Sequence, residues 1–254
     1  MMKRLVYALI FSLTCLISTE MIFAQENTLP PACIPSNYLD VDWWKERHEA
    51  NKARIEQGNV DLLLIGDSIT HTWDREVGQK VQEYYYGDRN FINLGFGGDM
   101  TGNVLWRLND LPLDKIEPKA AMLLIGINNL WVPCNQNPAD VAQGTKMIVE
   151  KLESLYPNIK ILVLFTFVVG ENPDTPERFR VARENAAVLD LLRGDPHVIL
   201  KDINYLWLDE SNHIKKEMLG DFCHPTEDGC KAWGAAVEPE IAKMLGDTPK
   251  QPMK

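Results

Sequence analysis

The sequence predicts an α/β fold, a three-layer α/β/α sandwich around a five-stranded parallel sheet. Short apolar runs alternate along the chain with longer segments of helical character, which is typical of parallel strands joined by helices that cover both faces of a sheet. The chain has 254 residues, of which 45% are hydrophobic and 24% charged. This is enough for one such domain with a sizeable core, and the sequence shows neither an internal repeat nor a second domain.

The expected strands are apolar runs that end at small or polar residues. In chain order they are Val60–Ile65, Phe91–Leu94, Ala120–Ile125, Ile159–Phe165 and Val198–Leu200. The expected helices are Trp43–Gln57, which Gly58 ends, a segment that begins after Ser68, one that runs through Val104–Leu108, and then Pro138–Leu155, Glu177–Leu192 and Asp228–Leu245.

The N-terminus has the composition of a targeting segment. Lys3 and Arg4 precede the apolar run Leu5–Ile17, and a cleavage position follows Ala24, so residues 1–24 are predicted to be a secretory signal peptide. A retained N-terminal helix is the alternative, and Cys15 is compatible with a lipoprotein signal. The protein is therefore expected to be exported to the periplasm or the medium.

The remaining segments divide simply. Residues 25–42 contain three closely spaced prolines and are expected to be an extended linker. The domain is expected to span residues 43–246, and residues 247–254 are expected to be a frayed tail.

Charge and cysteine content restrict the partners and the environment. A formal net charge of -10 disfavours binding to nucleic acid. No apolar stretch after the first is long enough to cross a bilayer, so stable membrane insertion is not expected.

In an oxidising compartment, Cys33, Cys134, Cys223 and Cys230 allow up to two disulfides in three connectivities, with Cys223 and Cys230 the most local pair. Both a monomer and a homodimer fit these features.

Ser68 occupies a position suited to a nucleophile. It follows the strand Val60–Ile65 and begins a helix, so it is expected at the sheet edge where ligands bind in such folds, with its N–H at a helix N-terminus that favours negative charge. A helix cap is the alternative role for a lone serine there. Two further strands end in Gly97-Gly98-Asp99 and Asn128-Asn129, and the agreement of three strand ends favours a site.

A serine attacks an acyl carbon when a base takes its proton and hydrogen-bond donors hold the oxyanion that forms. The expected donors are the N–H groups of Ser68 and Gly98 and the side-chain amide of Asn128, although both strand ends also fit ordinary turns. The expected base is His224, because Asp221 lies three residues earlier and can fix the tautomer of the ring. Such acid–histidine pairs also occur at ordinary caps.

The other histidines are weaker candidates for the base. His213 has Glu210 at the same spacing but lies in a polar segment, and His48 and His71 lie in helices, where surface or packing roles are expected. Among residues near the expected site, Asp67, Trp131 and Phe222 are candidates for substrate binding, with core packing as the alternative for the two aromatic residues.

No metal or cofactor is expected. The chain has no His-Glu-x-x-His pair, no Walker A sequence and no dinucleotide-binding glycine pattern, and its cysteines lack the paired short spacings of metal sites.

Four blocks resemble those of the SGNH, or GDSL-type, hydrolases, and they occur in the family's order. They are Gly66-Asp67-Ser68-Ile69, Asn93-Leu94-Gly95-Phe96-Gly97-Gly98-Asp99, Gly126-Ile127-Asn128-Asn129 and Asp221-Phe222-Cys223-His224-Pro225. The second block, with Val104-Leu105-Trp106-Arg107-Leu108 behind it, is most similar to the catalytic-subunit subgroup of the platelet-activating factor acetylhydrolases. The chain departs from the family at Ile69, where leucine is usual, and at Asn129, where many members carry aspartate.

The resemblance implies a flavodoxin-like SGNH hydrolase fold and hydrolysis of an ester through an acyl-enzyme, without a metal or cofactor. It implies that Ser68 is the nucleophile, that Gly98 and Asn128 complete the oxyanion hole with the Ser68 N–H, and that Asp221 orients the base His224. The expected function is that of a secreted esterase of short acyl esters, with acetylated carbohydrate as the substrate. A lysophospholipase or lipid acetylhydrolase is one alternative. An inactive glycan-binding module is another, and its expected sign, a damaged block, is absent from the sequence.

Overall fold

Five parallel strands form the predicted sheet, in the spatial order β2-β1-β3-β4-β5. The structure is a computed structural model that describes residues 29–254, so the predicted signal peptide lies outside the described residues. The strands are β1 (Leu62–Gly66), β2 (Phe91–Gly95), β3 (Ala120–Leu124), β4 (Lys160–Leu164) and β5 (Val198–Lys201). All five expected strands are confirmed, with bounds that differ by one or two residues.

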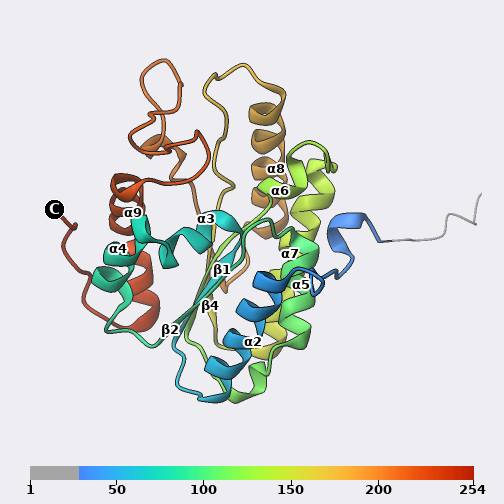
Figure 1. Cartoon of the computed structure of the whole chain (residues 1–254), viewed down its shortest axis with the longest axis vertical. Coiled ribbons are helices and arrows are strands. Elements are labelled where there is room, and N and C mark those ends of the chain that lie inside the picture. Colours follow the sequence, from blue (N-terminus) through green and yellow to red (C-terminus); the bar gives the residue numbers. More distant parts are fainter. Residues whose placement is uncertain (1–28) are drawn as a thin grey trace, which may run out of the picture. The chain divides into compact units, whose positions relative to one another are not determined.

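Helices cover both faces of this sheet (Figure 1). The α-helices are α2 (Asp42–Glu56), α3 (Ser68–His71), α4 (Glu76–Tyr86), α5 (Thr101–Asp110), α6 (Ile127–Leu130), α7 (Pro138–Leu155), α8 (Pro176–Leu192) and α9 (Glu227–Leu245). Short 3-10 helices are η1 (Pro31–Cys33), η2 (Thr72–Asp74), η3 (Leu113–Lys115) and η4 (Asn204–Leu206). Helices α4 and α9 cover one face, and α2, α5 and α7 cover the other, with α8 packed beside α7. The three-layer sandwich is therefore confirmed.

The two faces have separate cores because side chains alternate along each strand. Leu62 and Leu64 of β1 pack with Tyr85 of α4 and Trp233 of α9. The intervening side chains, such as Leu63, face the opposite core beneath α2, α5 and α7. Every residue of β1 is buried, which explains why this strand appears in the sequence as a continuous apolar run.

The long helices begin at the capping residues that the sequence supplies. The side chain of Asn137 accepts the N–H of Ala139 at the start of α7, and Thr226 accepts the N–H of Gly229 at the start of α9. These side-chain oxygens replace partners that the first N–H groups of a helix lack. Helix α9 ends at Gly246, whose φ of 78° is left-handed.

Part of the expected linker is packed against the domain. Ala32 and Cys33 of η1 are buried, the Thr101 hydroxyl donates to the carbonyl of Ala32 at 2.6 Å, and the Ser36 N–H donates to the carbonyl of Gly102 at 3.1 Å. The expectation of an extended linker is thus wrong for this stretch. A Cβ on Gly144 of α7 would lie 2.6 Å from the Ala32 carbonyl, so only glycine permits the approach.

The C-terminal segment is not frayed, which corrects the sequence-based expectation. Its backbone donates from Lys250 N to Glu238 at 2.8 Å and from Met253 N to the Tyr85 hydroxyl at 3.1 Å. Arg89 joins the same cluster through Asp247 at 2.9 Å. These polar contacts with α4 and α9 are specific, and a polar, proline-containing composition did not reveal them.

The four described cysteines are free thiols, so no disulfide links them, contrary to the sequence-based possibility. Cys33 lies in η1 under α7, whereas Cys230 points into the core beneath α9. Burial raises the pKa of Cys223 and that of Cys230 to about 12, so both thiols are unreactive near neutral pH. Within residues 29–254, no helix combines the length and apolar character that spanning a bilayer requires.

Candidate active site

Ser68 begins α3 at the carboxyl edge of the sheet, directly after β1. The side chain of Asp67 accepts the N–H of Ile69 at 2.9 Å, and the Thr72 hydroxyl donates to the Ser68 carbonyl at 3.0 Å. The Ser68 N–H lies at the first position of the helix, where it has no intrahelical partner. The strand-to-helix turn therefore directs both the hydroxyl and a free N–H of Ser68 to this edge.

Asp67, a candidate for substrate binding, is almost fully buried. Its exposed fraction is 1%, one carboxyl oxygen caps α3, and the other has no hydrogen-bond partner among the described residues. Burial raises the pKa of Asp67 to about 7. Asp67 therefore caps α3, a position that the sequence pattern did not separate from substrate contact.

Ser68, His224 and Asp221 form a continuous hydrogen-bonded chain. His224 Nε2 lies 2.8 Å from Ser68 Oγ, although 156 positions separate the two residues. His224 Nδ1 lies 2.8 Å from Asp221 Oδ2. With the Nδ1 proton held by the carboxylate, Nε2 is free to accept a proton from the serine hydroxyl.

The loop between Asp221 and His224 is shaped to bring these side chains together. Asp221 Oδ1 accepts the N–H groups of Cys223 at 3.1 Å and His224 at 2.7 Å. Phe222 between them has a φ of 60°, an uncommon conformation for a residue with a side chain. Burial alone would raise the pKa of Asp221, but the hydrogen bonds from His224 outweigh it and lower the pKa, so the carboxylate stays ionised.

The expected oxyanion donors lie on neighbouring turns. Gly98 has a left-handed φ of 79° and is exposed, and a Cβ placed there would meet nothing within 4 Å. The Asn128 side chain, on α6, donates to the carbonyl of Asp99 at 2.9 Å. This bond holds Asn128 against the turn that carries Gly98 and leaves one amide hydrogen of Asn128 for another acceptor.

A buried ion pair supports this turn from below, and the sequence analysis did not assign it. Asp99 is fully buried, with Arg107 Nε donating to it at 2.9 Å and Trp44 Nε1 donating at 2.7 Å. The Arg107 guanidinium also lies 4.1 Å from the ring centroid of Phe96. The signal that could have identified this network is an acid inside the glycine turn and an arginine two helical turns later.

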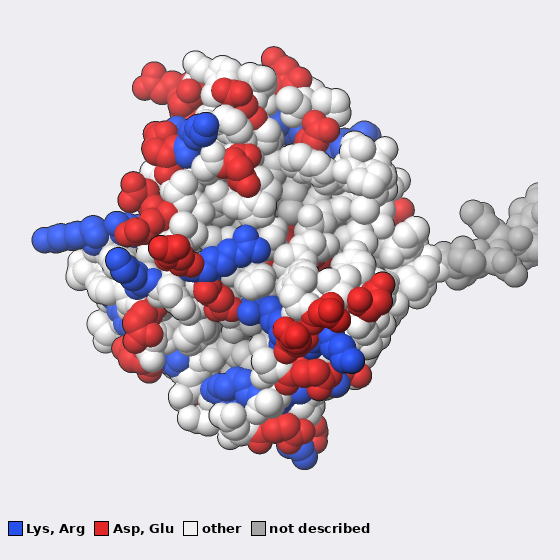
Figure 2. Space-filling model, in the orientation of Figure 1, with Lys and Arg blue, Asp and Glu red and all other residues white. Residues whose placement is uncertain are grey.

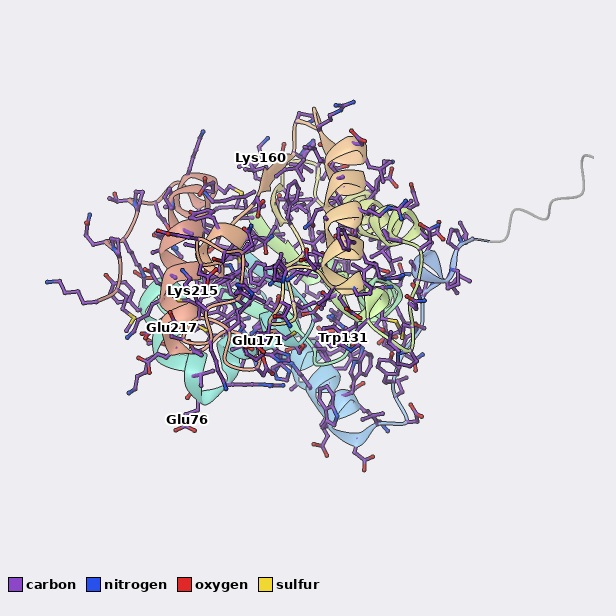
Figure 3. The ribbon with its side chains drawn as sticks, turned by 90° about the horizontal axis from the view of Figure 1, so that it is seen from above. Glu76, Trp131, Lys160, Glu171, Lys215 and Glu217 are labelled. Carbon is purple, nitrogen blue, oxygen red and sulfur yellow. The ribbon has the colours of Figure 1, made fainter. Side chains whose placement is uncertain are left out.

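The remaining candidates have different positions. Trp131 follows the last residue of α6, with 42% of its surface exposed, and is labelled in Figure 3. Phe222 is half-buried and packs against the core. His48 is buried with Nε2 2.8 Å from Asp110, and His71 stacks on Trp43, so both fit the packing roles expected for them.

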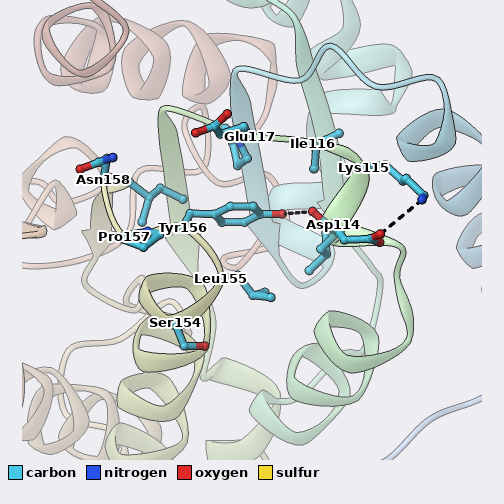
Figure 4. Close-up of a pocket in the computed structure, with 12 residues that line it drawn as sticks. Asp114, Lys115, Ile116, Glu117, Ser154, Leu155, Tyr156, Pro157 and Asn158 are labelled. Carbon is cyan, nitrogen blue, oxygen red and sulfur yellow. Dashed lines mark hydrogen bonds and ion pairs between the residues drawn. The ribbon is translucent and has the colours of Figure 1, made fainter.

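A hollow of about 550 Å³ lies at the opposite edge of the sheet (Figure 4). It is lined by the segments that lead into β3 and β4, including Glu117 and Asn158, and Tyr156 donates there to the carbonyl of Leu113 at 2.8 Å. Because Ser68 follows the carboxyl end of a strand, this hollow is separate from the candidate site. Figure 2 shows both signs of charge interspersed over the visible face, around a hollowed area that is mainly uncharged.

The sequence matches known proteins over most of its length. The family described as "GDSL-like Lipase/Acylhydrolase family" matches residues 64–232, which include the Ser68, Asp221 and His224 chain. Platelet-activating factor acetylhydrolase IB subunit alpha2 of Rattus norvegicus is 29% identical over 225 residues, covering 87% of this chain and 94% of the relative.

Solved structures share the fold at lower sequence identity. A putative acylhydrolase from Bacteroides fragilis has a TM-score of 0.65 at 15% identity, covering 83% of this chain and 99% of that one. An acetylxylan esterase from Geobacillus stearothermophilus has a TM-score of 0.57 at 16% identity, covering 75% of this chain and 96% of that one.

Proposed function

This chain is a carboxylic ester hydrolase of the GDSL-like lipase/acylhydrolase family, and we propose that it cleaves acetyl esters through an acyl-enzyme formed on Ser68. The observation that carries the proposal is the 2.8 Å approach of His224 Nε2 to Ser68 Oγ, together with the 2.8 Å contact of His224 Nδ1 with Asp221. A nucleophile, a base and a group that orients the base are the parts that acyl transfer by serine requires. This geometry also disfavours an inactive glycan-binding module.

In the acylation step, Ser68 Oγ attacks the carbonyl carbon while its proton passes to His224 Nε2. The oxyanion accepts hydrogen bonds from the N–H groups of Ser68 and Gly98 and from the Asn128 amide, and Asp221 stabilises the positively charged ring. When the tetrahedral intermediate collapses, the bond to the alcohol oxygen breaks and His224 gives that oxygen its proton. The alcohol leaves, and the acyl group remains on Ser68.

Deacylation repeats these steps with water as the nucleophile. His224 takes a proton from water, the resulting oxygen attacks the acyl carbon, and the same donors hold the second oxyanion. Collapse releases the carboxylic acid and returns the proton to Ser68. No group other than the chain's own residues and water is needed for the balance of atoms and charge.

We propose acetylated carbohydrate as the substrate and export as the location. Two kinds of similar protein, the rat acetylhydrolase subunit and the bacterial acetylxylan esterase, are named for removing acetyl groups. In residues 1–24, two basic residues precede an apolar run, a pattern typical of secretory signal peptides that supports export. An exported protein meets acetylated glycans. A lipid acetylhydrolase is the second candidate, supported by the name of the rat relative.

The test compares Ser68→Ala with a control, Ser154→Ala, whose hydroxyl makes an exposed local bond to Lys151 on α7. With 4-nitrophenyl acetate, the Ser68 variant should lose activity and the control should keep it. Wild-type turnover by the Ser68 variant would reject the mechanism. Activity should also fall at acid pH, because a protonated His224 cannot act as a base.

Substrate class and export have separate tests. A series of acyl chain lengths, set beside acetylated sugars and lysophospholipids, should show preference for acetyl groups on sugars, whereas faster cleavage of lipids would favour the second candidate. The mature protein should begin near Gln25 and appear outside the cytoplasm. An intact Met1 in exported or cytoplasmic fractions would contradict cleavage.

A further inference from the structure

Two side chains, those of Trp43 and Arg75, border the turn that carries Gly98. A Cβ placed on the adjacent Gly97 would lie 3.5 Å from Trp43 Cη2 and 3.8 Å from Arg75 Nη2. Consecutive Cα atoms are about 3.8 Å apart, so Trp43 Cη2 and Arg75 Nη2 both lie within about 9 Å of the Gly98 Cα. An acetyl group has only one methyl beyond its carbonyl, so most contacts of an acetyl ester in such a site are made by its alcohol part, and Trp43 and Arg75 are near enough to the expected oxyanion donor Gly98 to make them.

Trp43 is placed to present an aromatic surface. Its exposed fraction is 45%, whereas the next residue, Trp44, is fully buried and holds Asp99. The Trp43 ring stacks on His71, with ring centroids 6.1 Å apart and an interplanar angle of 25°. Burial, reinforced by Arg47 and Arg75, lowers the pKa of His71 to about 4, so this supporting ring is neutral.

Arg75 carries a charge that the protein leaves uncompensated. Its side chain makes no hydrogen bond or ion pair with any residue in the described part of the chain, while Arg47 nearby pairs with Asp74 and donates to the Gly95 carbonyl. The backbone of Arg75 is fixed on both sides, because its N–H donates to Thr72 at 3.0 Å and its carbonyl accepts from Gly78 at 2.9 Å. An exposed guanidinium of this kind suits a carboxylate, which it can bind through two parallel hydrogen bonds.

We propose that Trp43 and Arg75 form the subsite for the leaving alcohol, and that this alcohol is a sugar ring bearing a carboxylate, so that the substrate is an O-acetylated hexuronate. The apolar C–H face of the ring packs on the indole, and the carboxylate binds the guanidinium. The chemistry that is recognised is an anion beside an apolar ring face. This inference rests on the proposed acetylesterase function and names its substrate class.

A phosphate on an acetylated glycerol would supply the anion without the ring. The two sources make different demands on Trp43, because only the sugar offers a flat face to the indole. They are therefore separated by substrates that carry the anion with and without a ring.

The experiment compares two substrates that differ only in the charged group. Methyl O-acetyl-galacturonide carries a carboxylate, and methyl O-acetyl-galactoside carries a hydroxymethyl group in its place. Acetate release gives kcat/KM for each, and wild type should prefer the uronide by about tenfold or more, as expected for a charge-assisted hydrogen bond. Arg75→Gln should bring the ratio of the two constants close to one, and Arg75→Lys should restore part of it.

Using this ratio protects the test from damage to folding, because general damage lowers both constants together. The matched control is Arg193→Gln, at the C-terminal end of α8, where an exposed arginine pairs with Asp190. It should keep the wild-type ratio. Trp43→Ala should lower kcat/KM for both sugars about fivefold relative to vinyl acetate, which has no ring, and Trp43→Phe should restore most of the loss.

Three results would overturn the proposal. The first is a wild-type ratio of kcat/KM for uronide over galactoside near one, and the second is a ratio that Arg75→Gln leaves unchanged. The third is faster hydrolysis of an acetylated glycerol phosphate that depends on Arg75 but not on Trp43. Failure of the underlying function has a different signature, because the wild type would then release no acetate even from vinyl acetate. Hydrolysis of vinyl acetate without any Arg75 effect rejects the subsite alone.

Discussion

Replacing Asp221 by asparagine should disable the base without unfolding the protein. Asp221 Oδ1 already accepts two backbone N–H groups, from Cys223 and His224, while Oδ2 faces His224 Nδ1 at 2.8 Å. Asparagine has one acceptor oxygen, which the two N–H groups occupy, so its NH2 group faces Nδ1. Nδ1 must then accept, the ring proton moves to Nε2, and Nε2 cannot take the proton of Ser68.

The size of the expected loss of activity depends on how far Asp221 fixes the tautomer of His224 and on how exposed the two side chains are to water. In serine protease triads, this type of substitution lowers kcat by about 10⁴-fold. Here the side chains of His224 and Asp221 are 34% and 61% exposed, so water can compensate in part. We therefore expect kcat/KM to fall by about 10² to 10⁴-fold, or about 3–5 kcal/mol of transition-state stabilisation. The free energy of unfolding should change by less than about 1 kcal/mol, because both backbone hydrogen bonds remain.

The assay is kcat/KM for 4-nitrophenyl acetate, measured beside urea unfolding. The control is Asp209→Asn, since Asp209 Oδ1 accepts backbone N–H groups from Ser211 at 2.8 Å and His213 at 2.9 Å in a similar turn. The His213 ring lies 3.9 Å from Asp209. This control should leave both the activity and the stability close to those of wild type.

The result that refutes the reasoning is a folded Asp221→Asn variant whose kcat/KM lies within tenfold of wild type. Such a variant would show that His224 keeps the productive tautomer without the carboxylate. An equal loss in the control would show that the assay responds to general surface changes.

Further predictions concern groups away from the reacting atoms. Burial raises the pKa of Glu184 to about 8, so the folded protein loses stability as the pH rises from about 4.5, where this residue ionises in the unfolded chain, to 8. Glu184→Gln should remove this loss, so that in urea unfolding the variant is more stable than wild type by a few kcal/mol at pH 8 but by little at pH 4.5. A difference in stability that does not change with pH would contradict the assignment. Arg107→Met should lower the free energy of unfolding by about 3–5 kcal/mol, because it leaves the Asp99 carboxylate buried without its charged partner. The double variant with Asp99→Leu should recover part of this stability, whereas losses that simply add would count against the ion pair. Deleting residues 247–254 should lower the free energy of unfolding by about 1–3 kcal/mol with KM for 4-nitrophenyl acetate unchanged, and an unaltered urea midpoint would show that the docked tail contributes nothing.

Much of the architecture could be predicted because it depends on local patterns. A strand such as Val60–Ile65 is buried on both faces and is therefore apolar throughout, so it can be recognised in the sequence without knowing which strands lie beside it. Helix starts such as Thr226 and Asn137 also appear locally, because a cap acts within three residues. Ser68, Gly98 and Asn128 followed from strand ends, since parallel strands bring all their carboxyl ends to one edge. Asp221 and His224 followed from their spacing and from the resemblance to a known family.

Other features depend on contacts between distant segments and have no local pattern. Asp67 is polar and next to Ser68, yet burial decides that it caps a helix. Adjacent tryptophans Trp43 and Trp44 look alike in sequence, but one is exposed beside Gly97 and the other is buried against Asp99.

The sequence by itself determined the α/β class, the strands and the residues suited to acyl transfer, because hydrophobic periodicity and turn chemistry act over short distances. Only the tertiary structure decided that His224 reaches Ser68, that residues 31–36 and the C-terminal tail dock on the domain, and that the four described cysteines stay unpaired. Such contacts join segments that are far apart in the chain. Their formation depends on which surfaces remain once the two cores on either side of the sheet have packed.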